Sequence, residues 1–351
     1  MSTDNLPSGV IALPLTRQPF IPTTPSAAVQ PPNVYYVRIL FPPATVAGAP
    51  TPPVIHTCQV DTGSCGIVIP ESLLYVGGDV NGSLLPGVTK GDPATVYYEP
   101  SSNNLTGYYY QVAQLGLGAD ENGNCATLCE NVTLVGAAGM NPTVGMMGVG
   151  FGRPRSYGTN VFLGAPSGYS SYLFTTAGIW LGYTPQNLPN ASAYRFQALQ
   201  PAPVSLPSTS LWETPVANFT LVPPGHGAAQ TSVGNAILDT GVNLMLLGLD
   251  SAGWREQFIG AQLTIAWPDG NGGTIYSYTL TITGAEAPPG ANENPSSPKL
   301  VYTVAPAPTS PKYIVPQGVT SPSFVNTGID AIQGAAFYFD AHVGQIGFAP
   351  Y

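Results

Sequence analysis

Two copies of the triplet Asp-Thr-Gly, which begin at Asp61 and Asp239, are the residues best suited to chemistry in this chain. Each copy follows a short apolar run that ends just before the aspartate, and each is followed by a second apolar run. Burying a carboxylate between apolar strands is costly unless hydrogen bonds and a partner surround it. One triplet of this kind is a common polar turn. Two copies 178 residues apart predict two halves that each present one aspartate to a shared site.

A pair of carboxyl groups can activate water. Two carboxyls that meet cannot both ionise easily, so they share one proton. The ionised carboxyl takes a proton from the water, while the protonated one polarises a carbonyl group and stabilises the oxyanion that forms. The split in pKa belongs to the pair, so the sequence does not assign the proton to Asp61 or to Asp239. The competing interpretation is that each aspartate only caps backbone N–H groups of its own turn.

Several further stretches, in the same order and at similar spacing, resemble the pepsin-like aspartic proteases. The resemblance covers most of the chain and implies an all-β, two-lobed pepsin-like fold with an active-site cleft between the lobes. The N-terminal lobe would span residues 1–174 and carry Asp61 and a flap, and the C-terminal lobe would span residues 175–351 and carry Asp239. The further stretches are Gly145-Met146-Met147-Gly148, Gly178-Ile179-Trp180-Leu181-Gly182, Phe337-Tyr338-Phe339-Asp340 and Gln345-Ile346-Gly347-Phe348-Ala349-Pro350.

The resemblance also implies a function. The chain would be an aspartic-type endopeptidase that hydrolyses the peptide bonds of an extended polypeptide at acidic pH, with Asp61 and Asp239 as catalytic residues. No cofactor is implied and no metal, and the spacing of the four cysteines is not a zinc pattern. The alternative is a catalytically weak or inactive pepsin-fold protein that binds another protein or acts as an inhibitor.

The residues that follow each aspartate have supporting roles in the family. The threonines hydrogen-bond across to the opposite lobe. The glycines leave room for backbone N–H groups to approach the carboxylates. A serine after the glycine can donate to the outer oxygen of the aspartate. These expected supporting residues are Thr62, Gly63, Ser64, Thr240 and Gly241.

The second motif departs from the family pattern at two places. Ser64 can donate to Asp61, whereas Val242 cannot donate to Asp239, and losing one donor should raise the affinity of Asp239 for a proton. Further along, Asn326-Thr327 stands where the family has two apolar residues. We expect the first departure to shift the working pH upward without abolishing activity, and the second to affect substrate preference more than the reaction.

The resemblance is weaker at the positions that would contact substrate. By position, residues 95–112 form the family's flap, a hairpin that presents a tyrosine to the cleft, and Tyr97 and Tyr98 both compete for that role. Neighbours in a strand face opposite ways, so only one of them can point at the cleft. Gln59 and Met146 are expected to line a substrate pocket, although Gln59 stands where the family usually has an apolar residue.

Composition excludes several classes of protein. Gly 41 and Pro 38, with only 8% charged residues, fit many short strands joined by turns better than helices. The net charge of -9 comes with nine Lys plus Arg and no basic cluster, so we expect no nucleic acid as partner. No apolar run without Gly or Pro approaches transmembrane length, so no membrane contact is expected either. The expected partner is a polypeptide substrate, bound by a monomer.

Cysteines and glycosylation motifs favour an oxidising compartment. An even number of cysteines, Cys58, Cys65, Cys125 and Cys129, predicts at least one disulfide bond, with three possible connectivities. No apolar signal region follows Met1, so a signal peptide is not present in this sequence. We nevertheless expect a secreted or extracytoplasmic glycoprotein, since five Asn-x-Ser/Thr motifs occur, at Asn81, Asn104, Asn131, Asn190 and Asn218.

The elements that must position the two aspartates are predicted as short strands. Asp269-Gly270-Asn271-Gly272 is a strong turn between two of them. The only helical signal is short, at residues 251–258, and the Pro-rich segments 16–33 and 285–311 are predicted as connections. Strands are expected at 9–15, 34–40, 57–60, 66–70, 95–98, 106–112, 179–181, 216–222, 236–238, 244–247, 263–267 and 275–283.

Overall fold

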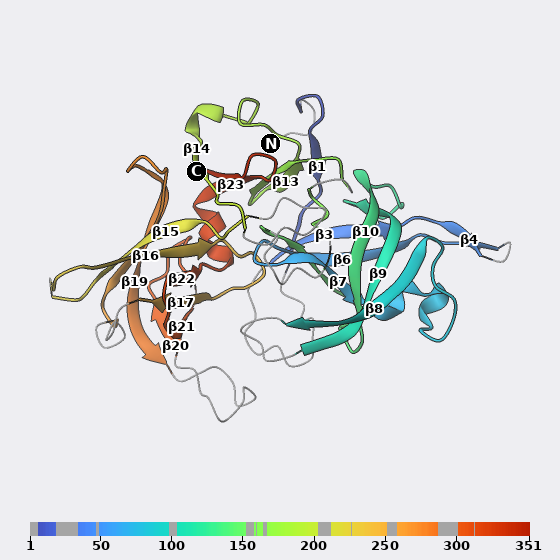
Figure 1. Cartoon of the computed structure of the whole chain (residues 1–351), viewed down its shortest axis with the longest axis horizontal. Helices are drawn as coiled ribbons and strands as arrows, with labels where there is room; N and C mark the ends of the chain where they lie inside the picture. The colour runs from blue at the N-terminus through green and yellow to red at the C-terminus, as the bar shows by residue number, and fades with distance from the viewer. Residues whose placement is uncertain are drawn as a thin grey trace.

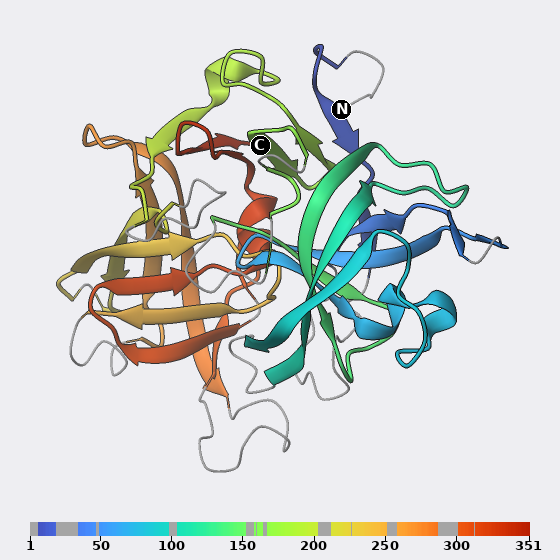
Figure 2. The ribbon, with the colours of Figure 1, turned by 45° about the vertical axis from the view of Figure 1, so that its right-hand side comes forward.

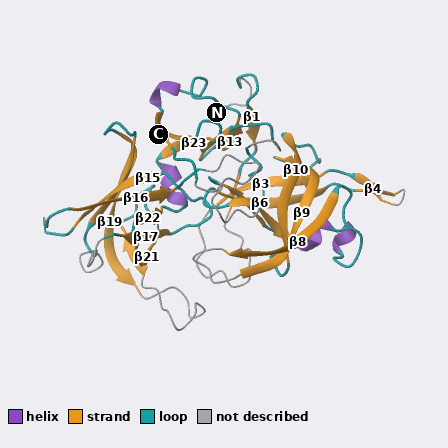
Figure 3. Cartoon of the chain, viewed as in Figure 1, coloured by secondary structure: helices purple, strands orange, loops and turns teal. Residues whose placement is uncertain are grey.

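β-strands dominate the described structure, which is a computed structural model (Figure 3). The expected all-β class is therefore confirmed, and the helices of the described residues are short 3-10 segments, η2 (Glu71–Leu74), η3 (Val76–Gly78), η4 (Ala191–Ala193) and η6 (Ile329–Gln333). None of them is long and apolar enough to cross a bilayer. The structure describes residues 6–18, 34–46, 49–97, 104–151, 158, 160–163, 167–202, 212–225, 227–250, 258–286, 301–311 and 313–351.

The first aspartate belongs to an eight-stranded sheet. Its central strands are buried on both faces, which explains why their sequences are nearly continuous apolar runs. The edge formed by the long hairpin β8–β9 alternates buried and exposed residues instead. The strand order is β2 (Thr16–Gln18), β3 (Val34–Phe41), β6 (Val54–Asp61), β11 (Gly145–Val149), β7 (Cys65–Pro70), β10 (Thr127–Ala137), β9 (Asn104–Leu117) and β8 (Val88–Tyr97).

The second aspartate belongs to a closed barrel. Its outer strands alternate buried and exposed side chains, as expected for a sheet with one face on the core. Figure 1 shows the barrel strands on the left and the eight-stranded sheet on the right, and the two still lie side by side after a 45° turn (Figure 2). The barrel order is β15 (Val216–Val222), β16 (Gln230–Ile237), β22 (Ser323–Asn326), β17 (Met245–Leu249), β21 (Tyr313–Val319), β20 (Val301–Val304), β19 (Thr274–Glu286) and β18 (Gln262–Pro268).

A six-stranded sheet joins the two halves. It takes one strand from the N-terminal end of the chain, two from the middle, one from the chain just beyond the middle and two from the C-terminal end. A small pair, β4 (Ala44–Val46) and β5 (Ala49–Thr51), stands apart. The order of the six is β1 (Ile11–Leu13), β13 (Gly178–Leu181), β12 (Ser171–Thr175), β23 (Ala335–Asp340), β24 (Gln345–Pro350) and β14 (Arg195–Ala198).

One hydrophobic cluster runs through all three sheets. Aromatic side chains make the junctions. Tyr35 of β3 meets Phe174 of β12 at 5.1 Å between ring centroids. Trp267 of the barrel meets Phe348 of β24 at 5.2 Å. The two halves therefore share a core with the sheet between them, and the expected boundary between residues 174 and 175 falls inside β12 of that sheet.

Most predicted strands match the structure, and several are longer than predicted. The strand at 216–222 has the predicted bounds, whereas the strand predicted at 57–60 begins three residues earlier, at Val54, and ends at Asp61. The predicted turn at Asp269 is present, with its carboxylate accepting hydrogen bonds from the N–H groups of Asn271 and Gly273. The helix predicted at 251–258 lies, apart from residue 258, outside the described residues.

The prediction of a disulfide bond is wrong for this structure, in which all four cysteines are free thiols. Cys58 pairs with Gly145 of β11, and Cys65 pairs with Val149 four positions further along the same strand. Four strand residues span about 13 Å, whereas a disulfide needs Cα atoms within about 7 Å. In the other pair, the Cys129 thiol donates to the carbonyl of Val161 at 3.5 Å.

Candidate active site

Both aspartates lie where a buried strand meets a tight turn. Asp61 is the last residue of β6, and Asp239 follows β16 by two residues. Their side chains are only 5% and 6% exposed. In each half a third strand lies between the two strands that flank the turn: β11 separates β6 from β7, and β22 separates β16 from β17. The local architecture is therefore repeated, as the two matching motifs predict.

The two turns are joined by their threonines. The Thr62 hydroxyl donates to the carbonyl of Leu238 at 2.6 Å, and the Thr240 hydroxyl donates to the carbonyl of Val60 at 2.8 Å. Each hydroxyl also accepts the N–H of the other threonine at 3.1 Å. The predicted crossing by Thr62 and Thr240 is therefore present, with four buried hydrogen bonds that fix one turn against the other.

The glycines allow the two carboxyls to meet. A Cβ atom placed on Gly63 would overlap the carboxyl group of Asp239. A Cβ atom on Gly241 would lie 2.6 Å from the carboxyl carbon of Asp61, closer than real Cβ contacts. Each carboxyl thus packs against the glycine of the opposite turn, which brings the two predicted catalytic residues together. Only glycine fits at these two positions.

Asp61 accepts three hydrogen bonds from its own turn. The N–H groups of Gly63 and Ser64 donate to Oδ1 at 2.7 and 3.2 Å. The Ser64 hydroxyl donates to Oδ2 at 2.5 Å, as predicted. Hydrogen bonds to an ionised carboxylate are the strong kind, so this turn is built to hold a negative charge.

Asp239 has a donor that the sequence did not reveal. The N–H of Gly241 donates to its Oδ1 at 2.8 Å, and the side-chain amide of Asn326 donates to its Oδ2 at 2.5 Å. The expectation that Asp239 lacks an outer donor because of Val242 is therefore wrong. The signal was present in Asn326, a polar residue where an apolar one was expected, but its contact spans 87 residues of sequence.

The two carboxyls differ electrostatically. Burial, then the charge of Asp61 and a hydrogen bond between the two carboxyls, raise the pKa of Asp239 well above its usual range. Hydrogen bonds from Asn326 and from the Gly241 N–H act in the opposite direction and offset only part of the rise. The protonated form of Asp239 is favoured in mildly acidic water for this reason.

Gln59 and Met146 lie beside the first turn. The Gln59 side chain is fully buried, and its amide nitrogen donates to the carbonyl of Gly241 at 3.0 Å, so Gln59 is a further link between the halves. Met146 is 7% exposed and packs in a small apolar cluster with Val68 and Val96. Their predicted contact with substrate stays a prediction.

The hairpin β8–β9 packs over this apolar cluster. Val96 is buried in the cluster, and its neighbour Tyr97 is 51% exposed, as expected for adjacent residues of one strand. Tyr98 lies outside the described residues, so the choice between Tyr97 and Tyr98 as the cleft-facing tyrosine stays open.

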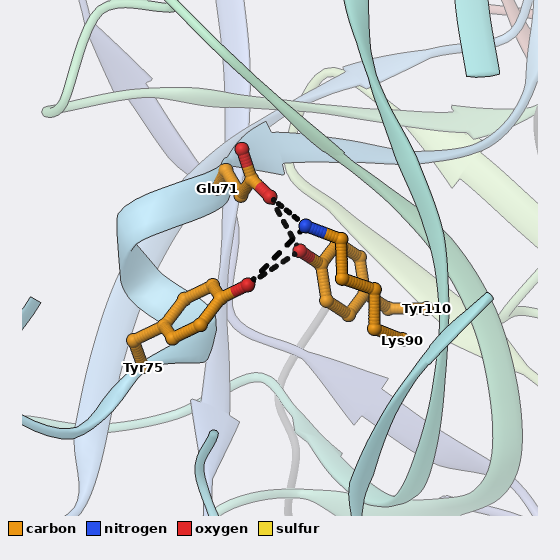
Figure 4. A network of polar contacts seen from close by, with 4 residues as sticks. All are labelled: Glu71, Tyr75, Lys90 and Tyr110. Atoms are coloured by element: carbon orange, nitrogen blue, oxygen red, sulfur yellow. Dashed lines mark hydrogen bonds and ion pairs between the residues drawn. The ribbon is translucent and has the colours of Figure 1, made fainter. Parts of the chain in front are cut away.

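A polar network fixes the base of the hairpin to η2 (Figure 4). The Lys90 ammonium of β8 lies 3.0 Å from the Glu71 carboxylate and 3.5 Å from the centroid of the Tyr108 ring. The Tyr110 hydroxyl donates to Glu71 at 2.6 Å, and the hydroxyls of Tyr75 and Tyr110 are 3.1 Å apart. Because η2 directly follows β7, the hairpin is tied to the strand that leaves the first aspartate turn.

Among the described residues, no group of three or more His, Cys, Asp or Glu side chains is arranged to hold a metal ion. The candidate site described above comprises the two buried carboxyls with their backbone donors, the hydroxyls of Ser64, Thr62 and Thr240, and the side-chain amides of Gln59 and Asn326. Compared with known proteins, the chain matches no family model and no curated protein.

Proposed function

We propose that the protein is an aspartic-type endopeptidase whose Asp61 and Asp239 share a proton and activate a water molecule. The observation that carries the proposal is the mutual packing of two buried carboxyls, each against the glycine of the opposite turn. Structural aspartates of an Asx turn need no such partner, because backbone N–H groups satisfy them. Two carboxyls brought together at a cost in burial and repulsion are an arrangement typical of general acid–base chemistry.

The donors suggest how the work is divided. Asp61 accepts three hydrogen bonds from its own turn, Asp239 accepts two from Gly241 and Asn326, and burial with the charge of Asp61 raises the pKa of Asp239. In our proposal Asp61 is therefore the ionised base that takes a proton from water. Asp239 is the acid that polarises the peptide carbonyl and then stabilises the oxyanion.

The surrounding fold is compatible with this reaction. We propose that the eight-stranded sheet and the barrel are the two lobes of a pepsin-like fold and that an extended polypeptide binds between them as an added strand. All five asparagines of the glycosylation motifs are exposed, which supports the proposal of a secreted glycoprotein. No nucleic acid, membrane or cofactor takes part in the proposed reaction, and the enzyme acts as a monomer.

The test is cleavage of a denatured protein across acidic pH by the wild type, Asp61→Asn and Asp239→Asn. Either substitution keeps the shape of the side chain and removes the shared proton, so we expect each folded variant to lose nearly all activity. Asp269→Asn is the matched control, because Asp269 only caps a surface turn and an asparagine keeps that cap.

Three results would count against the proposal. If a folded Asp61→Asn or Asp239→Asn variant keeps more than a small fraction of the wild-type cleavage rate, the pair is not responsible for the reaction. Equal loss in Asp269→Asn would show that the assay responds to folding. A folded wild type that cleaves nothing would favour the alternative, a protein that binds other proteins.

A further inference from the structure

The two halves place different residues at equivalent positions of the strand behind each turn. Met146 of β11 pairs with Gln59, two residues before Asp61, and with Val68, seven residues after Asp61. Asn326 of β22 pairs with Ile237, two residues before Asp239, and with Leu246, seven residues after Asp239. Met146 and Asn326 are therefore structural counterparts, one in each half.

The polar and apolar positions are exchanged between the halves. In the first half the turn supplies the donor, Ser64, and the strand behind it supplies an apolar residue, Met146. In the second half the turn has an apolar residue, Val242, at the position of the serine, and the strand supplies the donor, Asn326. Both halves thus end with one side-chain donor on the Oδ2 atom of the aspartate.

A second hydrogen bond fixes the orientation of the Asn326 amide. The N–H of Gly328 donates to Asn326 Oδ1 at 3.0 Å, and a backbone N–H can only donate. The carbonyl oxygen of the amide must therefore face Gly328, which leaves the NH₂ group to face Asp239. The side chain is 7% exposed, so water competes little for either bond.

We propose that Asn326 is the positioning residue of the second aspartate, and that it replaces the hydroxyl donor that Val242 cannot supply. Asn326 holds the Asp239 carboxyl in the plane set by the Gly241 N–H and favours its ionised form. The role of Asn326 in catalysis rests on the proposed function. The hydrogen bond from Asn326 to Asp239, and its effect on the titration of the carboxyl pair, do not depend on that function.

The titratable surroundings of Asp239 are simple. Asp61 faces it from the opposite turn, and β11, β17 and β22 contribute no charged residue. Asp330, in the segment after β22, interacts with Arg17. Tyr172 of β12 is near Asp61, and its hydroxyl donates to a backbone carbonyl. A change in the titration of the pair after substitution of Asn326 is therefore attributable to the lost donor.

The experiment follows the Asp side chains of ¹³C-labelled protein by NMR during a pH titration, with Asp239→Asn to assign the signal. In Asn326→Met, which copies the first half, the upper titration step of the pair should rise by about one pH unit. Adding Val242→Ser, which also copies the first half, should reverse the rise. Val242→Ser alone should shift the titration much less, because Asn326 already donates.

Peptide cleavage gives a second readout. In Asn326→Met the alkaline limb of kcat/KM, which reports loss of the upper proton of the pair, should move up by the same amount, so activity at a pH two units above the wild-type limb rises about tenfold. Asn243→Ala is the matched control, since it removes another buried amide near the turn that has no hydrogen bond from its nitrogen to a described residue. The NMR titration of Asn243→Ala and the pH profile of its kcat/KM should match those of the wild type.

The outcomes separate the inference from the proposed function. A wild type without proteolytic activity would remove the function, while the NMR shift would still support the role of Asn326. An unmoved titration in folded Asn326→Met would overturn the inference, and Asn326→Leu serves the same purpose if the methionine variant does not fold. An equal shift in Asn243→Ala, or no reversal by Val242→Ser, would also overturn it.

Discussion

His56 is a buried histidine five residues before Asp61 on the same strand. It is 5% exposed, on the face of β6 that carries Cys58 and Val60 into the core, and its Nε2 atom has no hydrogen-bond partner among the described residues. Burial lowers the pKa of His56 to about 4. An enzyme proposed to work in acid therefore contains a group whose protonation opposes folding.

We expect His56→Leu to make the protein more resistant to acid. The unfolded chain binds a proton at His56 near pH 6.5, whereas the folded chain binds it only near pH 4. The neutral histidine thus contributes stability that is present above pH 6.5 and lost as the pH falls toward 4. The loss amounts to about 2–3 kcal/mol by about pH 4.5. Denaturant unfolding of both proteins at neutral and acidic pH measures it.

The control for this prediction is His342→Leu, because His342 is exposed. That variant should keep the pH dependence of the wild type. If His56→Leu loses as much stability as the wild type on acidification, burial of His56 is not what makes the fold sensitive to acid.

Sequence and structure agree at some residues of the site and differ at others for a physical reason. The contacts of Asp61, Asp239 and the turn residues that follow them were predictable, because each residue contacts its own motif or the second copy of that motif. Asn326 was not, since a donor 87 residues away from its acceptor leaves no local pattern. The cysteines were misleading for a related reason: their even count carries no information on the distance between strands.

At the scale of elements, the crossing of the two turns connects the halves through four buried hydrogen bonds. Thr62→Val would leave the carbonyl of Leu238 and the N–H of Thr240 buried without partners. Unsatisfied buried groups cost about 1–3 kcal/mol each, so for the two groups we expect a loss of about 2–6 kcal/mol in the free energy of unfolding. Thr240→Val should cost a similar amount, and the double variant less than the sum, because the two hydroxyls share one network.

Denaturant unfolding of the two single variants and the double variant completes this cycle. Thr264→Val is the control, because the Thr264 hydroxyl bonds the Thr279 hydroxyl at the surface of the barrel. It should cost less than about 0.5 kcal/mol. Strictly additive losses at Thr62 and Thr240 would mean that the turns are stabilised independently.

Strand positions were predictable to the extent that burial leaves a pattern in the sequence. The strand at 216–222 alternates and has its predicted bounds, while β8 begins at Val88, well before the strand predicted at 95–98. Its first part contains Lys90 and Pro93 on either side of an irregularity in pairing. That part contacts η2 through the ion pair between Lys90 and Glu71, and a polar contact of this kind leaves no periodic pattern in the sequence.

At the scale of the whole molecule, neither half is complete without the sheet between them. β1 from the N-terminal end pairs with β13, and β23 and β24 from the C-terminal end pair with β12 and β14. The hydrophobic cluster is continuous from the eight-stranded sheet to the barrel. A chain connected in this way should lose its two aspartate turns together.

We therefore expect calorimetry to show one unfolding transition in which all parts of the chain take part. Leu134→Ala in the eight-stranded sheet and Leu263→Ala in the barrel remove side chains that are fully buried. Each leaves a cavity that costs about 2–5 kcal/mol. If the halves unfold as one unit, either variant lowers the temperature of the same single transition, and the calorimetric and van't Hoff enthalpies stay equal. Two transitions, with only one displaced by each variant, would show that the shared sheet does not couple the halves. The carboxyl pair would then be held only by the hydrogen bonds between the turns.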